Sequence, residues 1–126
     1  MRPRSLAEVA RTTLDGGSFD RSLANFLDAF YAAPHPSALA ETPALLEPVM
    51  GDPGRVQDAY LAATAEELAR VHGLSCPVWT AAEERRLHQP WFASSLAALR
   101  TVLIIESPVG FRSRNLFVSG NALSRA

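Results

Sequence analysis

The chain has 126 residues, of which 48% are hydrophobic and 20% are charged, and its formal net charge is −1. A length and balance of this kind are typical of one globular domain with a sizeable core, and they exclude disordered and fibrous classes. The most strongly apolar run, Val102–Ile105, is four residues long and far too short to cross a membrane.

The first residues predict no secretion signal. Arg2 and Arg4 stand near the start, but the apolar stretch that a signal peptide requires does not follow them. The single cysteine, Cys76, cannot form an internal disulfide, which is typical of a reducing compartment. We therefore expect a cytoplasmic protein with no membrane segment.

Two amphipathic helices are predicted in the first third of the chain. Ser5-Leu-Ala-Glu8 is a capping box, and an apolar stripe follows it as far as Leu14, before the stop signal Gly16-Gly17. A second helix is predicted over 18–32, where phenylalanines and leucines recur at spacings of three and four residues. Pro34 ends this second helix.

The segment 34–54 is the richest in proline, and its apolar residues indicate an ordered linker with short helical turns around 37–41 and 43–46. Asp52-Pro53 then predicts a helix start, with Asp52 as the cap and Pro53 in the first turn. This helix, over 52–71, is expected to be the longest, and His72-Gly73 closes it.

The second half predicts two further helices. Thr80-Ala-Ala-Glu83 is another capping box, which opens a short helix ending near His88. A last helix is predicted from Ser94 or Ser95, with Leu96, Leu99, and Val102 or Leu103 on its buried face. Residues 101–105 are β-branched except for Leu103 and are compatible with a buried strand. We favour a helix there because the helical spacing begins upstream.

The C-terminal segment 106–126 differs from the rest in its charge. Residues 13–69 hold nine carboxylates and two arginines, whereas three arginines and no acid follow Ser107. Its strand-like run is 115–119. The predicted fold class is therefore all-α, a compact bundle of about five helices in a single domain, 1–126, with an extended, arginine-bearing tail.

No catalytic or metal-binding motif is recognisable. The spacing of His72, Cys76 and His88 matches no zinc-binding pattern, and no glycine-rich phosphate loop or nucleophile elbow is present. We expect no cofactor, no metal and no enzymatic activity. An unfamiliar active site built from Glu84, Arg86 and His88 is the remaining enzymatic alternative.

The tail is the predicted partner-binding surface, because apolar side chains alternating with arginines are typical of interface cores. The candidate residues are Phe111, Arg112, Arg114, Asn115, Leu116, Phe117 and Arg125. The tail could instead lie on the acidic helices of its own chain, extend a partner's sheet or pair with a second copy as a homodimer. Binding of nucleic-acid phosphates by the three arginines is a further alternative.

The second half of the chain resembles a group of small bacterial proteins encoded beside a protein of the nucleotidyltransferase superfamily. The resemblance covers residues 76–126 and rests on Pro90-Trp-Phe-Ala-Ser, Leu99-Arg100, Glu106-Ser-Pro, Phe111-Arg-Ser-Arg-Asn-Leu-Phe-Val and Asn121-Ala-Leu-Ser-Arg. It implies an antitoxin-like or accessory protein that binds a nucleotidyltransferase-type partner. The resulting hypothesis is that the tail docks in this partner, with Arg112 and Arg114 on its carboxylates.

Overall fold

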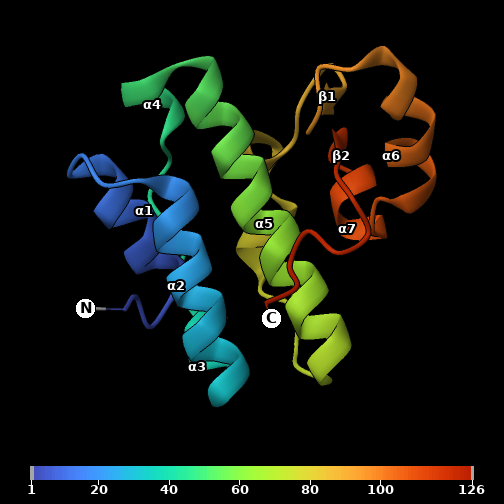
Figure 1. Ribbon diagram of the computed structural model, residues 1–126. Helices are drawn as coiled ribbons and strands as arrows, with labels where there is room; N and C mark the ends of the chain where they lie inside the picture. Colours follow the sequence, from blue (N-terminus) through green and yellow to red (C-terminus); the bar gives the residue numbers. More distant parts are fainter. Residues whose placement is uncertain (1, 126) are drawn as a thin grey trace.

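The computed structural model describes residues 2–125, and its long central helix, α5, has the other elements packed around it (Figure 1). The α-helices and strands in chain order are α1 (Leu6–Leu14), α2 (Phe19–Ala32), α3 (Ser37–Ala40), α4 (Glu47–Met50), α5 (Asp52–His72), β1 (Trp91–Phe92), α6 (Arg100–Glu106), α7 (Val109–Arg112) and β2 (Leu116–Phe117). Three short 3-10 helices are η1 (Val78–Ala81), η2 (Glu83–Arg85) and η3 (Ala97–Leu99). Helices α1 to α3 lie on one side of α5, and α6, α7 and the strands lie on the other (Figure 1).

The first two helices begin where their capping serines predict. Ser5 Oγ accepts the N–H of Glu8 at 3.1 Å, and Ser18 Oγ accepts the N–H of Arg21 at 3.2 Å. These bonds satisfy backbone donors that the first helical turn leaves free. Both helix predictions are confirmed, because start, end and buried stripe depend on residues that are close together in the sequence.

The long helix α5 is also confirmed, with a different start. It begins at Asp52 itself, and the residue before it, Gly51, has a left-handed φ of 68°. Asp58 anchors α4 to this helix, since its buried carboxylate accepts the N–H groups of Leu46 at 2.7 Å and Glu47 at 3.1 Å. The helical turn predicted at 43–46 consequently lies a few residues later, as α4.

Two apolar clusters share α5. The larger joins α5 to α1 and α2 through phenylalanine, leucine and alanine side chains, including Phe26, Phe30 and Leu61. The smaller lies on another face of α5, where Phe111, Leu116 and Val118 pack on alanines of the helix. The C-terminal segment therefore contributes to the core.

The prediction of a short α-helix after Thr80 is wrong, because two 3-10 helices, η1 and η2, occupy this region. The Thr80 hydroxyl donates to the carbonyl of Pro77 at 2.8 Å instead of capping a helix. The competing force is the burial of Arg85, whose guanidinium lies 5.0 Å from the Trp79 ring and donates to the Pro43 carbonyl. These long-range contacts set the backbone path here.

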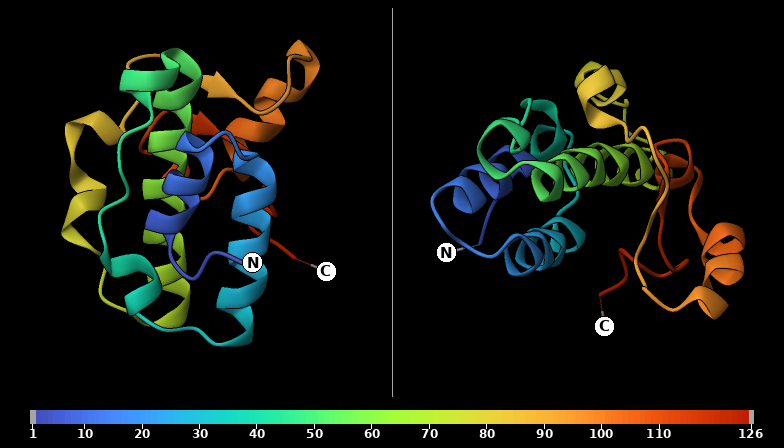
Figure 2. Two further views of the ribbon diagram at one scale, coloured as in Figure 1. Left: turned by 90° about the vertical axis from the view of Figure 1, so that its left-hand side faces the viewer. Right: turned by 90° about the horizontal axis from the view of Figure 1, so that it is seen from above.

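Residues 100–106 form helix α6, as favoured for 101–105, but the predicted buried face is wrong. Leu96, Leu99 and Val102 are exposed, and Leu103 alone within α6 is buried. The reason is the tertiary arrangement, since α6 stands at the edge of the molecule (Figure 2) and contacts β2 and the preceding η3.

The C-terminal tail is not extended along its length, which corrects the prediction. Residues 109–112 are helical, and only Leu116–Phe117 is a strand. This strand pairs in parallel with Trp91–Phe92, and the flanking bonds run from Trp91 N to Asn115 O at 2.8 Å and from Ala93 N to Phe117 O at 2.9 Å. These bonds pair part of the tail's backbone with β1 of the same chain, as buried backbone requires.

The fold is mostly helical, with two very short strands. In residues 2–125, four α-helices have seven residues or more and three have four. None of the helices in this part of the chain combines the length and the apolar character needed to cross a membrane.

Candidate functional site

The apolar residues of the predicted docking tail lie largely inside their own chain. Phe111 and Leu116 are fully buried, and the Phe111 ring meets Tyr60 of α5 edge to face at a centroid distance of 4.9 Å. Phe117 is partly buried and stacks on Phe92 at 5.1 Å. Phe111 and Leu116 are consequently inaccessible to a partner in this conformation.

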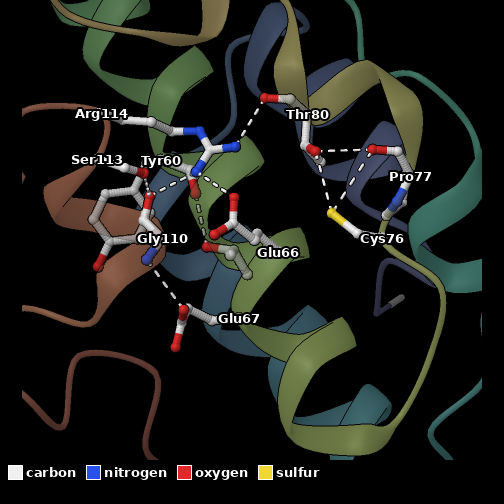
Figure 3. Close-up of polar contacts among 10 residues, drawn as sticks. Tyr60, Glu66, Glu67, Cys76, Pro77, Thr80, Gly110, Ser113 and Arg114 are labelled. Carbon is white, nitrogen blue, oxygen red and sulfur yellow. Dashed lines mark hydrogen bonds and ion pairs between the residues drawn. The ribbon is translucent and has the colours of Figure 1, made fainter.

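Arg114 is the most deeply embedded of the tail arginines (Figure 3). Its Nη1 donates to Glu66 Oε1 at 2.9 Å and to the Gly110 carbonyl at 2.7 Å, and its Nη2 donates to the Thr80 carbonyl at 2.9 Å. One guanidinium thus joins α5, α7 and η1. A planar group with several fixed donors suits this arrangement, which a lysine ammonium could not reproduce.

Glu67, beside Glu66 on α5, also holds the tail. Its Oε2 accepts the buried N–H of Gly110 at 3.1 Å (Figure 3). Its Oε1 pairs with Arg70 at 2.6 Å. Neighbouring carboxylates of α5 therefore bind the backbone and one arginine of the C-terminal segment. Of the arrangements predicted for the tail, the structure has the one in which the tail lies on acidic residues of its own chain.

The remaining polar tail residues differ in their contacts. Arg125 is bidentate on Asp28 of α2, with Nε–Oδ1 at 2.9 Å and Nη2–Oδ2 at 3.3 Å, and this hydrogen-bonded pairing lowers the pKa of Asp28. Asn115 has a φ of 62°, and its side-chain amide donates to Leu87 O at 2.8 Å. Arg112 is exposed and makes no ion pair within residues 2–125.

The residues weighed for catalysis or metal binding are dispersed. Glu84, Arg86 and His88 are exposed around η2, and His72 packs edge to face on Phe30 at 5.1 Å. In the described part of the chain, no three His, Cys, Asp or Glu side chains are grouped so that they could hold a metal ion.

A groove of about 810 Å³ lies between α2, the first half of α5 and the C-terminal segment. Its walls are mainly apolar, and the residues that line it are Phe19, Asp20, Leu23, Ala24, Leu27, Asp52, Pro53, Val56, Gln57, Tyr60, Trp91, Ala93, Val118, Ser119, Ala122, Ser124 and Arg125. The volume lies within the range of about 300–1,000 Å³ that is typical of ligand sites. We refer to this site as the groove.

Gln57 and Tyr60 are two of the neutral polar residues that interrupt the apolar walls of the groove. Gln57 Oε1 is shielded from solvent and has no hydrogen-bond partner among the described residues. Burial raises the pKa of Tyr60 to about 12, and the negative charge of Asp20 acts in the same direction. The Tyr60 hydroxyl is therefore neutral at physiological pH and can donate a hydrogen bond, and Gln57 can accept one.

The net charge around the groove is negative. Asp20 and Asp52 are exposed lining residues, and neither makes an ion pair within residues 2–125. The one cation of the lining, Arg125, is already neutralised by Asp28. The apolar walls and the negative charge of the groove together favour an occupant that is apolar and carries a positive charge.

The groove was not predicted from the sequence. Its lining comes from three segments, 19–27, 52–60 and 91–125. Taken alone, each segment has the sequence pattern of an ordinary amphipathic or turn-rich stretch. The apolar spacing of 19–27 and 52–60 was recognised, but it could not show that part of this apolar surface would remain uncovered.

Comparison of the chain with protein-family models, with curated proteins and with solved structures gives no match.

Proposed function

We propose that this protein is a non-enzymatic, antitoxin-like or accessory binding protein, and that its groove receives a segment of a partner protein. The groove itself carries the proposal: about 810 Å³ with apolar walls, two polar anchors and two carboxylates without ion pairs. A helical or extended segment with apolar side chains and one arginine or lysine would match each of these features. The anchoring side chains would provide most of the affinity.

The proposed partner is a nucleotidyltransferase-type protein, as the resemblance of residues 76–126 implies. The contact differs from the one first expected, since Arg114 and Arg125 are already paired with Glu66 and Asp28. In the proposed complex this chain supplies the acids, Asp20 and Asp52, and the partner supplies the cation. Holding a segment that the partner needs for catalysis would restrain its activity.

Nucleic-acid binding by the tail is the less favoured function. It requires three arginines that are free to contact phosphates, and two of them already have acidic partners in this chain. Arg112 alone would contribute little to the salt-dependent affinity that phosphate contacts produce.

Binding of the purified chain to the protein encoded by the neighbouring gene tests the proposal by calorimetry. Ala24→Trp, which fills the groove, is expected to weaken the complex at least about tenfold. Asp20→Asn combined with Asp52→Asn should weaken it and reduce its salt dependence. The matched controls are Ala32→Trp, on an exposed position of the same helix, and Asp15→Asn, an exposed acid outside the groove.

Tryptophan fluorescence reports directly where the partner binds. Trp91 lines the groove, whereas Trp79 is buried in the core and donates to Leu39 O at 2.9 Å. Binding should change the emission of the native chain, and Trp91→Phe should remove that change. Equal affinities of Ala24→Trp and Ala32→Trp, or a complex without a Trp91 signal, would contradict the proposal.

A further inference from the structure

One end of the groove combines aromatic rings with polar groups. The ring of Tyr60 on α5 meets the ring of Phe19 on α2 edge to face at a centroid distance of 6.2 Å, and both residues line the groove. Gln57 stands three residues before Tyr60 on α5, so the two side chains are neighbours on one helix face. Asp20, which follows Phe19, is near enough for its negative charge to raise the pKa of Tyr60. These four residues define the polar end of the groove.

The polar end offers hydrogen-bond acceptors that the chain itself leaves free. Gln57 Oε1 is shielded from solvent and bonded to no group of residues 2–125, and a buried acceptor without a donor costs free energy. The Asp20 carboxylate is exposed and takes part in no ion pair among the described residues. The Tyr60 oxygen is a further acceptor. A ligand that fits these groups supplies a positive charge and several donors.

The one cation that lines the groove, Arg125, is held away from the polar end. Its guanidinium is bidentate on Asp28, which follows Asp20 by eight residues on α2, or about 12 Å along the helix. Asp52, the other lining acid without an ion pair, stands eight residues before Tyr60 on α5, again about 12 Å away along the axis. Asp20 is therefore the acid beside the aromatic rings, and Asp52 belongs to the far end of the groove.

Given the function proposed above, we infer that the polar end binds an arginine side chain, and that this arginine is the cation of the partner's segment. Two guanidinium nitrogens donate to the Asp20 carboxylate, and the remaining donors reach Gln57 Oε1 and the Tyr60 oxygen. The flat face of the guanidinium lies against the aromatic rings of the polar end. The apolar remainder of the partner's segment then follows the groove toward its far end.

An arginine suits the polar end better than a lysine does, for two physical reasons. The acceptors come from two different helices, and a planar fork of five donors can reach several of them at once. A lysine ammonium is a compact charge that holds its water more strongly, and the apolar walls of the groove would remove part of that water. The polar end should therefore select the guanidinium over the ammonium.

Two small probes with the same apolar chain, hexylguanidinium and hexylammonium, test this preference without any partner protein. Each is titrated into the purified native chain, and proton–nitrogen correlation NMR gives the dissociation constant and the response of the Gln57 side-chain amide. Probes of this size should bind with constants of about 1–10 mM. Hexylguanidinium should bind at least about fivefold more tightly than hexylammonium and should shift the Gln57 amide signal.

Matched substitutions locate the bound head group. Asp20→Asn should weaken hexylguanidinium binding about fivefold, because it removes the charge that faces the guanidinium. Asp52→Asn makes the same change at the far end, where solvent and salt screen the charge, and should weaken binding less than about twofold. Gln57→Met removes an acceptor at similar volume and should lower the ratio of the two dissociation constants at least about twofold.

Equal constants for the two probes, equal effects of Asp20→Asn and Asp52→Asn, or an unchanged Gln57 signal would overturn the inference. None of these results would contradict the proposed function, because a partner segment could enter the groove with another cation. Conversely, the expected probe constants without a complex between this chain and the neighbouring gene's protein would support the guanidinium site and contradict only the proposed partner.

Discussion

Arg114 shows how one residue can have two opposite interpretations. In the sequence it is one of three arginines in a tail without acids, and this suggests a positively charged contact surface. In the structure it is 5% exposed and bonded to Glu66, Gly110 and Thr80. A buried cation is tolerated only when a carboxylate and carbonyl oxygens replace its water, so its neighbours determine its role.

Arg114→Ala should lower the free energy of unfolding by about 3 kcal/mol or more, because it leaves two backbone carbonyls and part of a carboxylate without their donor. Urea denaturation followed by circular dichroism measures the change. Arg112→Ala, two residues away and exposed, is the matched control and should change stability by less than about 0.5 kcal/mol. Similar losses in the two variants would show that Arg114 is not a structural anchor.

The elements differ in how far local signals determine them. Helices α1 and α2 have serine caps and regular apolar stripes, and they form where these predict. The region 78–85 carries an equally clear capping box, yet it forms 3-10 turns, because Arg85 is bound to the carbonyl of Pro43. A local preference worth about 1 kcal/mol is easily overcome when one buried side chain depends on a different path.

Gly54, in the first turn of α5, is the position where helix propensity and packing disagree most. Propensity alone predicts that Gly54→Ala stabilises the helix by about 1 kcal/mol. However, the added Cβ would lie 2.6 Å from the Leu46 carbonyl oxygen and 2.8 Å from the Glu47 nitrogen. We therefore expect the melting temperature to fall, with a loss of about 2 kcal/mol.

Gly120→Ala is the control for this substitution, since its Cβ would approach no atom closer than 3.4 Å. Its effect on thermal unfolding should be small. An increase in the melting temperature of Gly54→Ala would mean that α4 and α5 do not approach each other as closely as described.

At the scale of the whole molecule, the C-terminal segment completes the fold. Phe111, Leu116 and Val118 cover a face of α5 that would otherwise expose Ala59 and Ala63 to water. The segment then returns toward α2 (Figure 1). There Arg125 pairs with Asp28, and Tyr31 donates to the carbonyl of Leu123 at 2.8 Å.

A chain that ends at residue 106 should therefore fail to fold cooperatively. Burial of the three large apolar side chains contributes roughly 5–9 kcal/mol, which is comparable with the whole stability of a small domain. Thermal melts followed by near- and far-ultraviolet circular dichroism test this. A chain that ends at residue 123 is the control, because it loses the solvent-screened Arg125–Asp28 pair and one turn hydrogen bond, from Ser124 N to Asn121 O, but no buried apolar side chain. Equal melting of the two truncated chains would contradict a structural role for the tail.

The sequence by itself determined the helical class and the positions of α1, α2 and α5. It also indicated that 101–105 is helical. These features depend on caps, turn residues and apolar spacing within about four residues, and such signals are present in any short window of the chain.

Only the tertiary structure decided which of these surfaces are covered. It pairs Arg114 with a carboxylate 48 residues away, leaves the six residues of α6 other than Leu103 exposed, and brings α2, α5 and the tail together around the groove. Burial depends on what lies opposite a side chain in space, and the distance along the chain contains no information about that neighbour.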